Sequence, residues 1–265
     1  MGKKLNHAPV YLAVAQARFN PVLMLESYIP NIQDFFRKQG YPGLETSVLT
    51  AINLNLGMPA AIQQPQVPAS RINRYSFQNM SKTSEFVLDQ MSITYRTTGY
   101  DVFEIFLSEF MKGLDAVHKI VELSSTERIG MRYLDAIFPK EGESMENYLD
   151  TSLLGLSGKL AENLVHSFSQ TVVLMENVPI MARAIIQDGP LGIPPDLLPL
   201  TLIVPERFAK LTGRHAILDT DGSVTGHDVM DLDRVEAQLT DIHDKIAKAF
   251  RASITAKALE EWEQP

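Results

Sequence analysis

The sequence contains no cysteine among its 265 residues. This absence excludes disulfide bonds, thiolate nucleophiles, and zinc or iron–sulfur sites that need cysteine ligands. A chain without disulfides suits the reducing cytoplasm, and we expect that location. The sequence also shows no apolar run of the length that a secretory signal or a membrane span requires, so neither is predicted.

Positive charge is scarce as well. The 24 lysines and arginines are outnumbered by 32 aspartates and glutamates, which gives a formal net charge of −8. Sequence-independent binding to nucleic acid needs clustered lysine and arginine, so we do not expect nucleic acid as a partner. An acidic balance instead favours another protein as the partner.

Several catalytic and nucleotide-binding motifs are missing. The chain has no Walker A loop, no G-x-G-x-x-G, no G-x-S-x-G and no H-E-x-x-H. The sequence therefore predicts no cofactor and assigns no catalytic residue. A non-enzymatic role is favoured on this ground.

The apolar residues that are present follow two periods. Alternation over 9–19 indicates a strand, and similar runs recur at 75–77, 86–88, 92–96, 128–138, 164–175, 181–187 and 215–219. Helical spacing marks a first helix that ends near Gly40, two long amphipathic stripes at 103–121 and 231–250, and a short helix after Thr255. The Pro- and Gln-rich stretch 57–70 reads as a loop. Runs of strands between long helices predict an α+β fold, with an antiparallel sheet and long amphipathic helices packed on one face.

A short segment occurs twice in outline. The residues TGYDVF from Thr98 return as TGHDVM from Thr225, and each copy precedes a long helical stripe. Asp101 and Glu104 have the spacing of a helix capping box. The pattern is compatible with a single domain over 1–265 built as a pseudo-two-fold duplication, with halves at about 1–150 and 151–265. His118 and His243 lie beside apolar positions of the two stripes, where partial burial is the ordinary outcome.

An acidic and histidine-containing region follows the strand that begins at His215. Asp221 and Gly222 predict a turn. The side chains that bear on metal binding are His215, Asp219, Asp221, His227 and Asp228. Part of this set fits a calcium-binding loop, and histidine with carboxylates also suits a metal-dependent hydrolase that uses the region from His215 to Asp233. An acidic turn followed by helix-capping aspartates is the simpler explanation, and we favour it.

The segment RIGMRYLDAI carries the remaining candidate site. Alternation along a strand places Arg128 and Arg132 on the same face. With Tyr133 they are candidates for binding an anion or a partner protein, and ordinary surface ion pairs are the alternative.

Three segments carry a resemblance to a known family. They are KKLNHAPVYLAVAQARFNP, ERIGMRYLDAIFP and AFRASITAKALEEW, and the similarity runs from about Leu5 to Trp262. The chain resembles a sporadically distributed family of bacterial proteins with no assigned activity. Its markers are Arg128, Arg132, Tyr133 and Asp135 in the middle and Phe250, Ile254, Thr255, Leu259 and Trp262 near the end.

Patchy distribution is typical of accessory genes, including defence and toxin-neutralising loci. If the chain belongs to such a locus, it would be an accessory or neutralising subunit. The acidic charge and the missing catalytic motifs predict a protein-binding or regulatory subunit. A homodimer is a further option, in which the apolar stripe of 231–250 pairs across a two-fold axis. We expect a non-enzymatic protein that binds its partner through the uncovered sheet face or an exposed sheet edge. The metal-dependent hydrolase remains the alternative.

Overall fold

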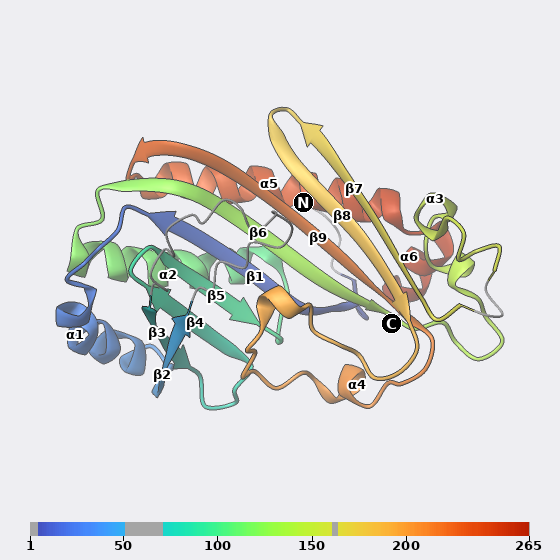
Figure 1. The fold of residues 1–265 in the computed structure, drawn as a ribbon, viewed down its shortest axis with the longest axis horizontal. Helices are drawn as coiled ribbons and strands as arrows, with labels where there is room; N and C mark the ends of the chain where they lie inside the picture. The colour runs from blue at the N-terminus through green and yellow to red at the C-terminus, as the bar shows by residue number, and fades with distance from the viewer. Residues whose placement is uncertain (1–4, 51–70, 161–163, 265) are drawn as a thin grey trace, which may run out of the picture.

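The computed structural model describes residues 5–50, 71–160 and 164–264, which form one nine-stranded sheet with helices (Figure 1). The strand order is β2-β3-β4-β5-β1-β6-β9-β8-β7, and every neighbouring pair is antiparallel. The predicted α+β class with an antiparallel sheet is confirmed. The predicted loop at 57–70 lies outside the described residues.

Runs of strands lie between the helices, as the two apolar periods indicate. The strands are β1 (Val10–Phe19), β2 (Gly43–Thr50), β3 (Arg71–Gln78), β4 (Ser84–Asp89), β5 (Ser92–Thr97), β6 (Ser125–Ile137), β7 (His166–Met175), β8 (Val178–Gln187) and β9 (His215–Val229). The helices are α1 (Leu25–Lys38), α2 (Phe103–Val121), α3 (Thr151–Leu154), α4 (Glu206–Ala209), α5 (Leu232–Ser253) and α6 (Ala256–Glu263), with 3-10 turns η1 (Met145–Asn147) and η3 (Pro195–Leu197). No helix in these ranges is long and apolar enough to cross a membrane.

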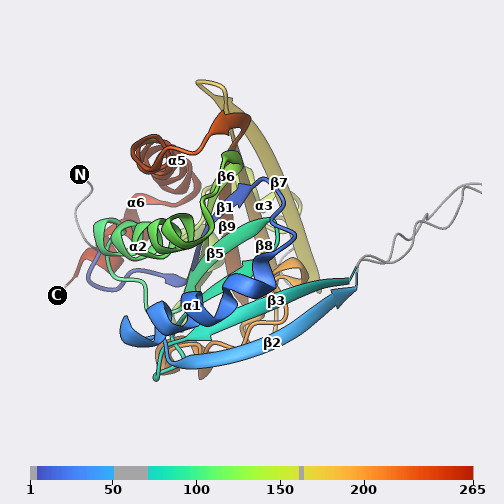
Figure 2. The same ribbon diagram turned by 90° about the vertical axis from the view of Figure 1, so that its left-hand side faces the viewer.

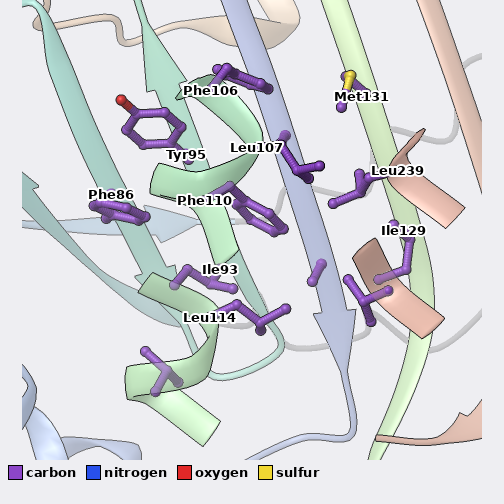
Figure 3. Packing of buried hydrophobic residues seen from close by; sticks show 14 of the residues in the cluster. Phe86, Ile93, Tyr95, Phe106, Leu107, Phe110, Leu114, Ile129, Met131 and Leu239 are labelled. Carbon is purple, nitrogen blue, oxygen red and sulfur yellow. The ribbon is translucent and has the colours of Figure 1, made fainter. Parts of the chain in front are cut away.

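One face of the sheet carries the main apolar core. Helices α2 and α5 lie on this side (Figure 2), and both contribute buried residues to one cluster with α1. Figure 3 shows how Phe86 and Tyr95 of the sheet lie near Phe106 and Phe110 of α2. Helix α2 approaches this aromatic layer so closely that a Cβ atom at Gly113 would lie 2.2 Å from Cε1 of Phe86. The glycine is therefore needed for packing.

The opposite face, which we call the open face, is covered only in part by the described residues. The segment that contains η3 and α4 packs over one end of it, where Tyr11, Leu12 and Phe208 are buried. The register of β1 against β6 shifts between Val10 and Leu12, which allows both Tyr11 and Leu12 to join this cluster. Toward the middle of the sheet the open face carries charged side chains instead.

Strand β9 corrects one prediction. It runs without interruption from His215 to Val229, so the predicted turn at Asp221 and Gly222 is wrong. A Cβ atom at Gly222 would lie 2.6 Å from Cδ1 of Ile180 and 3.0 Å from Cγ2 of Ile242 on α5. The glycine thus lets α5 approach the sheet. Close approach of a neighbouring element, and not a turn, explains this glycine inside a strand.

The starts of the two long helices correct a second prediction, which concerns helix capping. The N-cap residue of α2 is Val102, which makes no side-chain cap, so the capping box at Asp101 is wrong. The N-cap of α5 is Asp231, whose carboxylate accepts a hydrogen bond from the backbone of Arg234. The first copy of the repeated segment lies between β5 and α2, whereas the second copy lies within the end of β9. The duplication stays a prediction.

Candidate functional site

Two predicted site residues meet at the centre of the open face. Arg132 on β6 donates two hydrogen bonds to Asp219 on the neighbouring strand β9, from Nε to Oδ1 at 2.7 Å and from Nη2 to Oδ2 at 2.8 Å. Arg183 on β8 donates to the same Oδ2 at 3.1 Å. Asp219 is fully buried, so its charge depends on these two arginines.

Arg132 also holds the segment that covers one end of the open face. Its guanidinium donates to both carboxylate oxygens of Asp196, which lies in η3. Burial lowers the pKa of Arg132, but the hydrogen bonds to Asp219 and Asp196 outweigh burial and raise that pKa above its ordinary value. The hydrogen bond from Arg132 holds the pKa of Asp196 below its ordinary value.

Four guanidinium groups line a cavity of about 170 Å³ on this face. They belong to Arg74, Arg96, Arg128 and Arg132, and we call it the arginine cavity. Gly130 makes room for one of them, because a Cβ atom there would lie 2.9 Å from Nη1 of Arg128. The Nε atoms of Arg74 and Arg96 are buried, and neither has a hydrogen-bond partner within the described ranges.

Carboxylates balance much of this positive charge. Arg96 pairs with Glu85 at 2.6 Å, and Arg128 lies 3.9 Å from Asp221. Burial raises the pKa of Asp221, and Arg128 opposes that shift. The structure brings Arg128 and Arg132 to one face, as the alternation predicted. Anion binding by this pair stays a prediction.

Tyr133 lies on the helix-covered face and lines a different cavity. This cavity has a volume of about 550 Å³ and lies between β6, β9, the start of α2 and helix α5; we call it the α5 cavity. Asp135 and Thr220 line it from the sheet, while Phe103 and His243 line it from the helices. Volumes of about 300–1,000 Å³ are typical of small-molecule sites.

Two polar groups of the α5 cavity have no hydrogen bond to another described residue. No hydrogen bond joins the carboxyl group of Asp135 to any described residue, although the residue is only 2% exposed. The hydroxyl of Thr220 is also buried without a hydrogen-bond partner. Burial, with a smaller contribution from the charge of Asp219, raises the pKa of Asp135 to about 8.

The wall formed by α5 is aromatic. The ring of His243 stacks on Phe103 with a centroid distance of 3.9 Å, and its Nδ1 atom lies 3.2 Å from the hydroxyl of Tyr133. Burial lowers the pKa of His243, so the imidazole is held neutral at physiological pH. His243 thus orients Tyr133 within the cavity.

The candidate metal ligands are distributed along one strand. Asp219 and Asp221 lie on the open face among arginines, and His215 is buried with its ring stacked on Phe138 at 4.7 Å. His227 and Asp228 lie near the far end of β9, where Asp228 is 3.4 Å from Arg234. Within the described ranges no group of three or more histidine, aspartate or glutamate side chains is arranged to hold a metal ion. The partial match to a calcium loop fails, because this segment is a strand.

Comparison of the chain with protein-family models and with curated proteins finds no match. The candidate sites therefore rest on geometry. Sequence reasoning missed Arg74, Arg96 and Thr220, because strands distant in the sequence bring them to the cavities. Asp135 gave one signal, since it follows Met131 and Tyr133 at the alternate positions that face the helices.

The sheet edge formed by β7 is a third feature. Its sequence, HSFSQTVVLM, contains no lysine, arginine, aspartate, glutamate or proline. Phe168, Val172 and Leu174 are 58%, 57% and 70% exposed. They pair with Ile185, Met181 and Pro179 of β8, so the three share one face of the sheet.

Proposed function

We propose that the protein is a binding subunit that recruits a partner protein by pairing a strand of that partner with β7. The observation that carries the proposal is the apolar stripe of Phe168, Val172 and Leu174 on an edge strand without charge or proline. A strand added to an exposed edge gains main-chain hydrogen bonds, and alternate side chains give it specificity.

The lack of protection on β7 supports this proposal. Edge strands usually carry lysine, proline or a bulge, because an unprotected edge pairs with other chains. The pairing of β7 with β8 is regular over all ten positions, from His166 with Gln187 to Met175 with Val178. The outer backbone groups of β7 are therefore arranged as a regular template.

The chemistry of β7 defines the partner strand. It is an extended segment with apolar side chains at alternate positions, which would continue the stripe of Phe168, Val172 and Leu174. The resemblance to a patchily distributed bacterial family motivates a finer proposal, in which the partner is a component of a defence or toxin locus and this chain is its accessory or neutralising subunit.

Val172→Lys tests the proposal, because it places a charge in the middle of the apolar stripe. Val48→Lys is the matched control, since Val48 is 54% exposed on β2 at the opposite edge of the sheet. We expect a partner captured by the wild type and by Val48→Lys to be lost with Val172→Lys. Hydrogen exchange of the purified complex is expected to protect the amides of β7.

Equal capture by all three proteins, or no protection of β7, would contradict the proposal. Light scattering distinguishes a different protein as the partner from a second copy of this chain. A dimer that Val172→Lys dissociates would identify the partner as a second copy of this chain. No observation in the described residues favours the metal-dependent hydrolase, because arginines occupy the oxygens of Asp219.

A further inference from the structure

We propose that the α5 cavity binds a small organic amine, with its ammonium group at Asp135 and Thr220 and its apolar body against the aromatic wall. This inference concerns the helix-covered face and is independent of strand pairing at β7. It rests on the unpaired polar groups of the cavity floor, the character of the walls, and the volume.

The floor presents two polar groups that receive no hydrogen bond from the described part of the chain. Asp135 lines the cavity, is 2% exposed, and has no hydrogen bond to a described residue. Thr220 lies on the adjacent strand, opposite Tyr133 in the register, and its buried hydroxyl has no partner among the residues that the structure describes. Buried polar groups are almost always hydrogen-bonded, so the unpaired hydroxyl of Thr220, together with a carboxyl group that no described residue bonds, indicates a missing partner. An ammonium group supplies several N–H donors at once.

The carboxyl group of the floor favours a cation over a neutral ligand, because an ammonium group beside Asp135 would stabilise the ionised form that burial disfavours. A buried carboxylate is usually paired with a positive charge. No lysine or arginine forms an ion pair with Asp135 in the described part of the chain. The charge of Asp219, on the other face of the sheet, adds repulsion and not compensation. A ligand ammonium would provide the counter-charge that the protein omits.

The walls suit the body of such a ligand. Tyr100, Phe103 and Tyr133 line the cavity, and Ile246 and Phe250 add apolar surface from α5. Aromatic rings attract cations through their faces, and apolar walls bury the carbon skeleton. The volume of about 550 Å³ accommodates an amine with an aromatic or aliphatic body.

Matched probes test the proposal on the full chain. The amines are 2-phenylethylamine, cyclohexylmethylamine and hexylamine, and each is compared with the corresponding alcohol by calorimetry and ligand-observed NMR. We expect at least one amine to bind at least tenfold more tightly than its alcohol. Asp135→Asn is expected to reduce amine binding to the level of the alcohol.

Two further variants make the result specific. Asp244→Asn removes an exposed carboxylate of α5 that does not line the cavity, and it should leave amine affinity unchanged. Ala247→Phe fills the cavity from α5 and should abolish binding of both probe classes. The proposal is overturned if no amine binds, if the alcohols bind as tightly as the amines, or if Asp135→Asn retains amine affinity. Alcohols that bind as tightly as the amines would assign the cavity to a neutral ligand, whereas amine affinity retained in Asp135→Asn would place the ammonium group away from Asp135.

Discussion

Arg132 and Asp219 form a two-point ion pair across β6 and β9, with N–O distances of 2.7 and 2.8 Å. The pair joins two strands whose residues are separated by 87 positions in the sequence. Asp219 is fully buried and Arg132 nearly so. The energetic weight of such a pair lies in the penalty for removing one partner and leaving the other charge buried.

Arg132→Met should therefore destabilise the protein strongly. Asp219 would retain only Arg183, and we expect the free energy of unfolding to fall by about 3 kcal/mol. Urea denaturation measures the change. Arg128→Met is the control, because Arg128 is partly exposed and should cost less than about 1 kcal/mol. A double variant with Asp219→Leu should recover much of the loss, since it removes the orphaned charge; a small effect of Arg132→Met alone would show that Arg183 suffices.

Asp135 should make stability depend on pH. Its pKa is raised from the ordinary 3.8 to about 8, so the folded protein binds a proton that the unfolded chain releases. The contribution of Asp135 is fully favourable below pH about 4 and is lost progressively as pH rises to about 8. Asp135→Asn should flatten this slope and stabilise the protein by about 1–3 kcal/mol at pH 8. Thermal unfolding between pH 4 and pH 9 tests it, and an unchanged slope would contradict the assignment.

Gly113→Ala tests the approach of α2 to the sheet. Alanine favours a helix over glycine by about 1 kcal/mol. The new Cβ would nevertheless lie 2.2 Å from Cε1 of Phe86, inside the aromatic layer of Figure 3. We expect a net loss of about 1–3 kcal/mol in denaturant unfolding. Ser108→Ala, at an exposed position of the same helix, should be neutral or slightly stabilising. A stabilised Gly113→Ala protein would mean that Phe86 moves aside readily.

Asp231→Ala tests the observed start of α5. Asp231 caps the helix through the amide of Arg234 at 3.1 Å, so its loss should cost about 1 kcal/mol. Asp228→Ala removes only an exposed ion pair and should cost less than about 0.5 kcal/mol. Chemical denaturation of both variants measures the difference. A larger loss of stability for Asp228→Ala than for Asp231→Ala would contradict the assignment of Asp231 as the cap.

Local patterns account for what the sequence predicted well. Alternation placed Arg128 and Arg132 on one face, and helical spacing located the two long helices. These signals depend on neighbours within one or two turns or along one strand. The explanation of Asp231 as a helix-capping aspartate is confirmed, because Asp231 is the N-cap of α5.

Tertiary contacts account for the features that the sequence did not predict. Asp221 and Gly222 have the local chemistry of a turn, but the glycine is required because α5 passes close above it. The sequence alone left the aspartates of β9 as candidate metal ligands. Strand pairing places Arg132 and Arg183 beside Asp219, which no local pattern shows. The α5 cavity depends on Asp135, Thr220 and His243 coming together from three separate elements. The periodicity of apolar residues along the sequence does not predict that these three residues line one cavity.

The strand order also has a consequence for synthesis of the chain on the ribosome. Strands β1 to β6 are contiguous in the sheet and are complete by Ile137, before any part of β7, β8 or β9 has been made. Strand β6 forms one edge of these six strands, and that edge stays unpaired until β9, the last strand to be made, is available. The first half of the protein thus acts as a template on which the second half is assembled, and β6 is exposed to mispairing for the whole interval.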